Sequence, residues 1–461
     1  MNTLLIFPKR EPFDKKKTYL KTYGPVPPLG ICYLAAVLRK ENMPVRLIDC
    51  HISSPEELKE AIGWADIVGI STPTVYAQAS LEIAEYAKSL DKIVIIGGPQ
   101  ATLDPEYFLH HNYVDYVLRG ESEYNLPRLL KSIRNKTKEQ IGGLAYRNGN
   151  NDIHSNPTSL VSNLDELPLP ARDLLPIQNY YPFNKGIITM ITSRGCPYQC
   201  IYCAKEIAGL KYRIRNPKLV VDEIEEIVTK YKPHHIRFNE DIFLLDKKRV
   251  IEICNEIVRR NLKLNWSCDG RADCIDEEII ISIKRAGCTS VSMGAETGSQ
   301  RILDYLNKKI TVEQTKRATK IIKKHNLKVH HYIIIGTPIE TLEDIEKTKQ
   351  LIKETRPTSI SVTLFSPFAG TKSWELLKDD LVLGDLSEMD FFTKLSFKHK
   401  NFTEEELLKI KQDLLDIQRK NKLKNSVNHF IHPFFTMRKI FELIKFRHFL
   451  KTIIENKNFS D

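Results

Sequence analysis

The sequence has few cysteines and no long apolar run, and each shortage excludes a class of protein. No stretch approaches the roughly 20 consecutive apolar residues that a membrane-spanning helix requires, so we expect no membrane-spanning segment. Nine cysteines among 461 residues are a small, odd number, and the apolar start from Met1 to Pro8 is too short for a secretory signal. We therefore expect no disulfide framework and a protein of a reducing compartment, the cytoplasm.

Basic residues are in excess, but they are not gathered into an arm that would bind nucleic acid. The net charge of +11 is spread along the chain and concentrates only in the C-terminal tail. No RNA-binding module is recognisable, so nucleic acid is not an expected partner. A hydrophobic fraction of 42% and a charged fraction of 28% are typical of a globular protein, here long enough for two or three domains.

Three cysteines lie together on one segment, with the spacing C-x3-C-x2-C. Cys196, Cys200 and Cys203 can bind three irons of a cubane cluster and leave the fourth iron open to a ligand. Electron-transfer ferredoxins use a fourth cysteine, and structural zinc sites use a second cysteine pair downstream. The other six cysteines are scattered, so the spacing favours a 4Fe-4S cluster that takes part in chemistry.

With the aromatic residue Tyr202 just before its last cysteine, this segment resembles the radical S-adenosylmethionine (SAM) superfamily. The resemblance implies that the open iron chelates the amino and carboxylate groups of SAM. It further implies that the cluster, reduced by a partner such as flavodoxin or ferredoxin, cleaves SAM to methionine and a 5′-deoxyadenosyl radical. That radical abstracts hydrogen from an unactivated carbon, a step that requires no protein general base.

Residues 1–135 alternate short β-branched runs with helical patterns, which predicts an α/β domain with a doubly wound, Rossmann-like parallel sheet. We expect strands at 4–7, 45–48, 67–71, 93–96 and 113–118, and helices at 29–40, 80–88 and 126–133. Ligands of such sheets lie at the carboxyl ends of the strands. The candidate ligand-binding residues there are Ser71, Thr72, Gly97, Gly98, Pro99, Gly120 and Glu121.

These turns, together with residues 27–30 and 47–49, resemble the cobalamin-binding domain that precedes the cluster domain in class B radical SAM methylases and anaerobic cyclase-like enzymes. The resemblance implies that the first domain binds cobalamin. The D-x-H-x-x-G motif of many such domains is incomplete, because Ser54 replaces the glycine that should follow Asp49 and His51. We interpret His51 as a surface loop residue. We expect cobalamin bound without a histidine axial ligand, or else a degenerate domain that has lost its cofactor.

A connector is expected at 136–186, with a hairpin turn at 148–150 in which Asn-Gly supplies a positive φ. From 187 to 375 the alternation of strand and helix returns six times, which predicts a partial (β/α)6 barrel with its site at the carboxyl ends of the strands. A helical C-terminal region is expected at 376–461. The predicted barrel strands are 187–193, 235–238, 264–267, 290–293, 329–335 and 359–364.

Polar residues follow several of the barrel strands and resemble the SAM-binding motifs of the family. Residues 266–273 match the pattern W-x-C-x-x-R-x-D, residues 294–297 resemble the G-x-E-S/T turn, and residues 336–340 resemble the G-x-P-x-E motif. By this resemblance the candidate SAM-binding residues are Tyr202, Glu240, Ser267, Arg271, Glu296 and Gly336.

Hydrogen-bonding chemistry supports a SAM-binding role for some of these residues, but several also fit a purely structural role. A carboxylate accepts two hydrogen bonds, which suits Glu296 to the ribose diol of SAM. Arg271 fits either the SAM carboxylate or a surface salt bridge. Asp241, beside Glu240, and Glu340 fit either ligand binding or the N-terminal caps of the helices that follow them.

The C-terminal region begins with a helical pattern from Thr403, which we expect to cap the barrel mouth. Its tail interleaves basic and aromatic residues, a pattern that suits an amphipathic helix at the inner face of an anionic membrane or a packed helix with a solvated basic face. If the tail lies on a membrane, the expected substrates include a lipid or isoprenoid. The tail residues are Arg419, Lys420, Lys422, Lys424, Arg438, Lys439, Lys445, Arg447 and Lys451, with Phe430, Phe434, Phe435, Phe441, Phe446 and Phe449.

Three hypotheses for the function follow. The first, which the two resemblances favour, is a cobalamin-dependent methyltransferase that methylates an unactivated carbon of a small molecule or lipid. The second is a radical SAM enzyme without methyl transfer, which cyclises or oxidises a tetrapyrrole or lipid. The third is a non-catalytic cofactor-binding protein, and the open iron that the cysteine spacing predicts argues against it.

Overall fold

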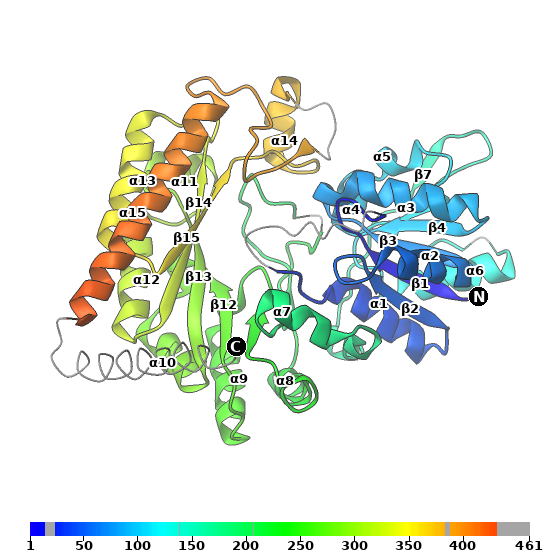
Figure 1. The fold of residues 1–461 in the computed structure, drawn as a ribbon, viewed down its shortest axis with the longest axis horizontal. Coiled ribbons are helices and arrows are strands. Elements are labelled where there is room, and N and C mark those ends of the chain that lie inside the picture. Colours follow the sequence, from blue (N-terminus) through cyan, green and yellow to red (C-terminus); the bar gives the residue numbers. More distant parts are fainter. Residues whose placement is uncertain (14–23, 138, 206, 383–387, 431–461) are drawn as a thin grey trace, which may run out of the picture.

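The computed structural model describes residues 1–13, 24–137, 139–205, 207–382 and 388–430, with side chains up to Asn421. The chain forms two α/β units, each built on one large sheet, and a crossing segment joins them (Figure 1). The predicted fold class is confirmed, because a doubly wound sheet precedes a curled sheet of six parallel strands.

The first sheet has the strand order β2-β1-β3-β4-β5-β6-β7, in which β1 to β5 are parallel and the last two strands are antiparallel. Its strands are β1 (Thr3–Phe7), β2 (Val45–Asp49), β3 (Ile67–Ser71), β4 (Ile93–Gly97), β5 (Tyr116–Leu118), β6 (Leu144–Arg147) and β7 (Ile153–Ser155). The helices of this unit are α1 (Leu29–Lys40), α2 (Pro55–Trp64), η1 (Thr74–Tyr76), α3 (Ala77–Ser89), α4 (Pro99–Leu103), α5 (Pro105–Leu109) and α6 (Asn125–Asn135).

Strand β1 shows why helices cover both faces of this sheet. Leu5 belongs to the same core cluster as Ile31 and Leu38 of α1, whereas Leu4 and Ile6 belong to a second cluster. All five side chains are almost fully buried. Because successive side chains of a strand point to opposite faces, an unbroken apolar run requires two buried faces.

The hairpin predicted in the connector is part of the first sheet, because β6 pairs with β5 and so extends the sheet beyond residue 135. The turn forms where it was expected, since the Asn148 amide donates to the Asp152 carbonyl at 2.9 Å. The prediction that Asn-Gly supplies the positive φ is wrong. Asn151 takes that conformation, with φ of 66°, because its place in the turn lies one residue beyond the Asn-Gly-Asn string.

The crossing segment is made of short turns rather than long helices. These are η2 (Leu164–Glu166), η3 (Arg172–Leu174), η4 (Ile177–Tyr180) and α7 (Tyr181–Asn184). Tyr180 is fully buried, and its hydroxyl donates to Asp49 at the end of β2 at 2.7 Å. This hydrogen bond fastens the segment to the first unit.

The second sheet is a parallel half-barrel with its strands in chain order from β8 to β15, apart from a small antiparallel ribbon of β9 and β10. Its strands are β8 (Ile187–Met190), β11 (His235–Phe238), β12 (Trp266–Gly270), β13 (Cys288–Glu296), β14 (Lys328–Ile335) and β15 (Ser359–Leu364), and the ribbon is β9 (Ser193–Arg194) with β10 (Arg213–Ile214). The helices are α8 (Pro217–Tyr231), η5 (Phe243–Leu245), α9 (Lys247–Arg259), η6 (Ala272–Cys274), α10 (Glu277–Arg285), α11 (Gln300–Tyr305), α12 (Val312–Lys324), α13 (Leu342–Thr355), α14 (Lys372–Leu377), η7 (Lys378–Asp380) and α15 (Glu404–Phe430).

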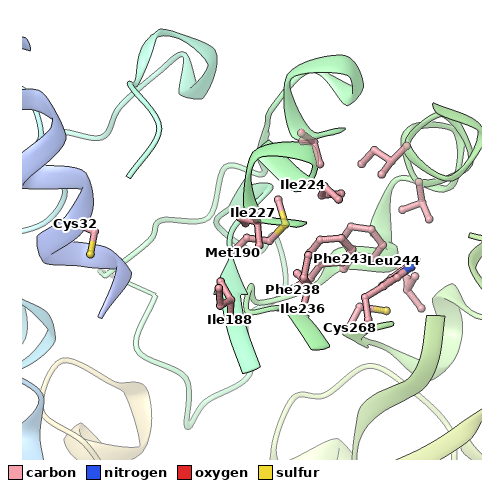
Figure 2. Packing of buried hydrophobic residues seen from close by; sticks show 14 of the residues in the cluster. Cys32, Ile188, Met190, Ile224, Ile227, Ile236, Phe238, Phe243, Leu244 and Cys268 are labelled. Atoms are coloured by element: carbon pink, nitrogen blue, oxygen red, sulfur yellow. The ribbon is translucent and has the colours of Figure 1, made fainter. Parts of the chain in front are cut away.

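Helix α9 begins later than expected, and its cap is not Asp241. Asp246 is the N-cap and accepts from the Arg249 amide at 3.0 Å. The delay has a packing cause, because Phe243 in the preceding turn is buried with its ring 4.7 Å from that of Phe238. Figure 2 shows these two rings side by side, with Leu244 next to them.

Helix α15 is present as predicted, but it does not cap the barrel mouth. Leu407, near its start, lies against the position of Gly336 at the end of β14, and further on Gln418 donates to the Thr358 carbonyl just before β15. The helix therefore runs along the side of the barrel, next to α13 (Figure 1). The basic aromatic tail beyond residue 430 lies outside the described residues, and no described helix is long and apolar enough to cross a membrane.

Candidate active site

The carboxyl ends of the two sheets face a shared cavity of about 310 Å³. The turns after β3, β4 and β5 line one side, and the ends of β8 and β11 with the ribbon line the other. From the candidate residues of the first domain, those that line it are Ser71, Gly97, Gly98, Pro99, Gly120 and Glu121. Thr72 does not line it, because its buried hydroxyl donates to Ser80 at 2.8 Å behind the turn.

The turn at Gly98 requires a glycine. Gly98 has φ of 92°, and a Cβ there would lie 2.6 Å from the Thr72 amide nitrogen and 3.1 Å from Ser71 Oγ. Any side chain would therefore clash with the neighbouring turn. The turns after β3 and β4 are therefore packed closely against each other at the edge of the sheet.

His51 does not line this cavity, and the interpretation of it as a surface loop residue is wrong. Its side chain is only 10% exposed. Nδ1 lies 2.9 Å from Asp49 Oδ1, and Nε2 lies 3.1 Å from the Tyr76 hydroxyl. Because both ring nitrogens have partners, His51 helps to hold the turn after β2 in place.

The three cysteines lie on the loop after β9, and backbone contacts fix that loop. The Cys196 amide donates to the Gly209 carbonyl at 3.2 Å, and the Ile201 amide donates to the Leu306 carbonyl at 3.1 Å. Cys196 and Cys200 are each 8% exposed, and Cys203 is partly exposed. The cysteine loop is therefore largely sheltered from water.

Among the described residues, no group of three or more His, Cys, Asp or Glu side chains is placed to hold a single metal ion. A zinc ion needs its ligands to converge on one point. A cubane cluster instead binds each cysteine through a different iron, so its cysteine sulfurs stand apart.

A second cavity, of about 370 Å³, lies at the mouth of the half-barrel. It shares Asn239, Glu240 and Asp241 with the first cavity, so the end of β11 forms a common wall. The other lining residues come from β12, β13 and β14, from the turn after β12, and from the loop between α11 and α12. They are Asp269, Gly270, Arg271, Ser292, Met293, Gly294, Glu296, Lys308 and Tyr332.

Glu296 is the centre of a buried polar cluster in this second cavity. Its Oε1 accepts from the Tyr202 hydroxyl at 2.9 Å and from Lys308 Nζ at 2.5 Å, and it is 4% exposed. Glu296 ends β13 at an irregularity in the strand pairing and has a φ of 59°, which is uncommon for a residue with a side chain. The backbone is thus bent to turn this carboxylate toward the aromatic residue of the cysteine loop.

Glu240 is held by the end of the neighbouring strand. Its Oε1 accepts from the Thr192 amide at 3.1 Å and from the Thr192 hydroxyl at 2.7 Å, and its Oε2 accepts from the Ser193 hydroxyl. Burial raises its pKa to about 7, although Arg249 and Thr192 oppose the shift. A carboxyl of this kind is ready to become fully charged when a cation binds beside it.

Arg271 directly follows β12 and lines the second cavity, as predicted, whereas Ser267 does not lie at the end of this strand. Arg271 makes two hydrogen bonds to Asp273, at 3.0 and 3.1 Å, and its guanidinium lies 3.4 Å from the ring centre of Tyr198 on the cysteine loop. Ser267 is the second residue of β12, three residues before its end, and its hydroxyl lies 2.8 Å from His235 Nε2. Ser267 does not line the cavity, because β12 continues three residues beyond the predicted end at Ser267.

Gly336 lies behind the second cavity rather than in its lining. Its amide donates to Glu340, and a Cβ there would meet Leu407 of α15 at 2.8 Å. Glu340 does not cap the next helix, since Thr341 is its N-cap and forms a capping box with Asp344. Burial raises the pKa of Glu340 to about 8.

Two family models match the chain. The model of the radical SAM superfamily matches residues 190–352, and that of the B12 binding domain matches residues 16–130. The uncharacterized methyltransferase PH0819 of Pyrococcus horikoshii is 30% identical over 452 residues, which cover 96% of this chain and 95% of that protein. The chain belongs to the cobalamin-binding radical SAM family.

Members of this family with more specific names also resemble the chain. An anaerobic magnesium-protoporphyrin IX monomethyl ester cyclase of Rubrivivax gelatinosus is 28% identical over 390 residues, 81% of this chain and 70% of that enzyme. Among solved structures, the cobalamin-dependent SAM radical enzyme OxsB with aqua-cobalamin and SAM bound superposes with a TM-score of 0.76 and 19% identity, over 90% of this chain and 67% of that one. This last likeness concerns the fold.

As a family member, the chain is a cobalamin-dependent radical SAM enzyme whose cofactors are a 4Fe-4S cluster, SAM and cobalamin. The hypothesis of a non-catalytic protein is therefore wrong. The described residues fit these groups: three sheltered cysteines for the cluster, a polar cavity beside them, and a glycine-edged cavity between the two units. The domain boundaries and the role of each residue in binding stay predictions.

Four charged residues at this site were missed by the sequence analysis. Lys308 contacts Glu296, and Glu123, Arg194 and Arg213 lie where the first unit meets the cysteine loop. No motif marks them, because each is one charged residue among the 127 of the chain. Only Arg194 carries a signal, since it directly precedes the Gly-Cys that opens the cysteine segment.

Proposed function

We propose that the enzyme methylates an unactivated carbon of a small-molecule or lipid substrate. The observation that supports this proposal is the common wall of Asn239, Glu240 and Asp241, which puts the cavity beside the cysteines next to the cavity between the units. When bound, the cluster and SAM supply a radical that abstracts hydrogen, and cobalamin supplies the methyl group. Adjacent cavities suit a reaction in which one substrate carbon must meet both.

The residues of the second cavity are proposed to bind and orient SAM. Glu296 would accept hydrogen bonds from the ribose hydroxyls and Tyr202 would pack near the adenosyl group. Glu240 would pair with the amino group as a charged carboxylate. Arg271 would act indirectly, because its bond to Asp273 and its contact with Tyr198 hold the cysteine loop against the barrel.

The residues of the first cavity are proposed to bind cobalamin through backbone and small side chains. Ser71, Gly97, Gly98 and Gly120 present the carboxyl edge of the first sheet without bulky groups. The carboxyl edge of a doubly wound sheet is the usual place for such a ligand. A reductant such as flavodoxin or ferredoxin is the proposed electron donor. We also propose that the enzyme is cytoplasmic and that its C-terminal tail contacts the inner face of the membrane.

A second candidate function is a radical reaction without methyl transfer. The observation that favours it is the similarity to the anaerobic cyclase of Rubrivivax gelatinosus over 81% of this chain. In that case the same cavities would bind the same cofactors, and the product would carry a new ring or a new oxygen function instead of a methyl group.

The test is anaerobic purification with cobalamin supplied, followed by assays for iron, sulfide, cobalt and reductive SAM cleavage. We expect a 4Fe-4S cluster and one cobalt per chain, 5′-deoxyadenosine upon reduction, and methylcobalamin when SAM is added to the reduced enzyme. Cobalt that forms no methylcobalamin would favour the second candidate. In Cys200→Ala we expect the cluster absorption and SAM cleavage to be lost, and retention of both would contradict the cluster assignment.

A further inference from the structure

Four charged side chains form an ionic contact between the two units, which we call the interdomain clasp: Glu121, Glu123, Arg194 and Arg213. Arg213 makes two bonds to Glu121, at 2.6 and 2.8 Å. Arg194 Nη2 donates to Glu123 at 2.7 Å, and its Nη1 lies 3.4 Å from Glu121. The two glutamates follow β5 of the first unit, and the two arginines belong to the ribbon of β9 and β10.

The clasp is buried, which sets it apart from the surface ion pairs of this protein. Its side chains are 3 to 13% exposed. Breaking one pair by removing a single partner would leave a buried charged group without its partner.

On the barrel side, the clasp leads directly to the first cluster ligand. Arg213 also donates to the Ala208 carbonyl at 2.7 Å. Gly195 is pressed against this same segment, because a Cβ there would lie 2.3 Å from the Lys211 carbonyl and 3.0 Å from the Ala208 carbonyl. The next residue, Cys196, donates its amide to Gly209. Any shift of the segment that Arg213 holds would thus be passed to Cys196.

On the other side, the clasp leads directly to the cavity between the units. Glu121 and Glu123 line that cavity next to Gly120, and Arg194 lines it from the opposite unit. Glu121 was expected to bind cobalamin, but both of its oxygens already have partners, because Oε2 also accepts from the Val161 amide at 2.6 Å. Its structural role is to join the cavity edge to the cysteine loop.

We infer that the interdomain clasp is a positioning device that sets the distance and orientation of the cobalamin cavity relative to the 4Fe-4S cluster. Glu123 and Arg194 are its central pair, since Arg194 lies two residues before Cys196. The inference concerns the cofactors and not the substrate, so it holds for methyl transfer and for cyclisation alike.

Two double variants test the inference, Glu123→Gln/Arg194→Gln and Glu121→Gln/Arg213→Gln. Each removes both charges of a pair, so neither leaves a buried charge alone. The control is Asp173→Asn, which removes the pair between Asp173 and Arg39 of α1, whose side chains are 37 and 48% exposed. Exposed pairs of that kind contribute little, so the control should behave as the wild type does.

The first readout needs no cofactor. Amide hydrogen exchange of residues 157–163 and 194–213 in the apoprotein should be roughly 10- to 150-fold faster in the double variants, because each variant gives up at least one hydrogen bond between charged groups that restrains local opening. The second readout is the cluster-to-cobalt distance from pulsed electron paramagnetic resonance of the loaded enzyme. We expect one narrow distance in the wild type and the control, and a broad distribution in the variants with iron and cobalt content unchanged.

The two readouts distinguish a positioning role of the interdomain clasp from a cobalamin-binding role of Glu121. Wild-type exchange rates and a wild-type distance in both double variants would overturn the inference. Loss of cobalt from Glu121→Gln/Arg213→Gln alone, with the distance unchanged in the other variant, would also overturn it and make Glu121 a cobalamin ligand instead. If one double variant does not fold, the other double variant tests the inference. The single variant Arg194→Lys keeps the positive charge and should show the narrow cluster-to-cobalt distance of the wild type.

Discussion

A methyl group placed on Gly294 should weaken SAM binding without disturbing the fold. A Cβ at this position would lie 2.2 Å from Glu296 Oε1 and 2.6 Å from Lys308 Nζ. Gly294→Ala therefore forces apart the two charged groups that meet at the end of β13, while it leaves their chemistry intact. The substitution is a steric test of whether Glu296 binds the cofactor.

The expected magnitude follows from the contacts that must be given up. Glu296 Oε1 has to retreat by at least about 1.2 Å to regain ordinary van der Waals contact, which disturbs its hydrogen bond from the Tyr202 hydroxyl, now at 2.9 Å. A hydrogen bond to a charged group contributes about 1.5 to 3 kcal/mol. If such bonds to SAM are lost, its Kd should rise roughly 10- to 150-fold.

The assay is equilibrium binding of SAM to the anaerobically reconstituted protein, with iron content and thermal unfolding measured in parallel. The matched control is Gly63→Ala in α2, where a Cβ meets nothing within 4 Å. That control should bind SAM normally and gain roughly 0.5 to 1 kcal/mol of stability from helix propensity. A Gly294→Ala protein with wild-type iron and wild-type SAM affinity would remove Glu296 and Lys308 from the SAM site.

Two predictions concern buried carboxyls. Burial raises the pKa of Glu240 to about 7, so SAM affinity should increase as the pH rises through 7 and Glu240 becomes charged; a Glu240→Gln protein with the same pH profile would contradict its pairing with the amino group. Burial also raises the pKa of Glu340 to about 8, so the native state keeps a proton that the unfolded chain releases, and stability should fall as the pH rises toward 8. In urea unfolding at pH 5.5 and 8.5, Glu340→Gln should lose less stability than the wild type, and an equal loss would show that Glu340 is already charged.

The parts of the site that follow from local sequence could be predicted. The cysteine spacing depends on one short loop, and Glu296 lies at a strand end because β-branched and small residues precede it. The strands of the first sheet could be predicted from apolar runs, whose side chains are buried on both faces of the sheet. In each case neighbours in the chain supply the deciding contacts, so pattern and spacing were enough.

The sequence predictions were wrong where contacts with residues distant in the chain select between two possible local structures. Asp241 and Asp246 are equally good helix caps by sequence, and the burial of Phe243 against Phe238 selects the second. Likewise, nothing in the sequence says that Ser267 lies inside β12 instead of at its end. The interdomain clasp was beyond prediction for the same reason, since its partners lie 71 and 92 positions apart.

The charges of the second cavity favour the proposed binding of SAM there over binding of an anionic ligand. Its lining holds four acidic residues, Glu240, Asp241, Asp269 and Glu296, and two basic ones, Arg271 and Lys308. Both cations are already paired, Arg271 with Asp273 and Lys308 with Glu296. Asp269 is paired with Arg237 at 2.9 Å, so Glu240 and Asp241 make up the remaining acidic excess. When its amino and carboxylate groups bind the open iron, SAM keeps the positive charge of its sulfonium, which would offset the cost of keeping Glu240 ionised. A phosphate or carboxylate substrate would add to that cost and is expected to bind outside this cavity.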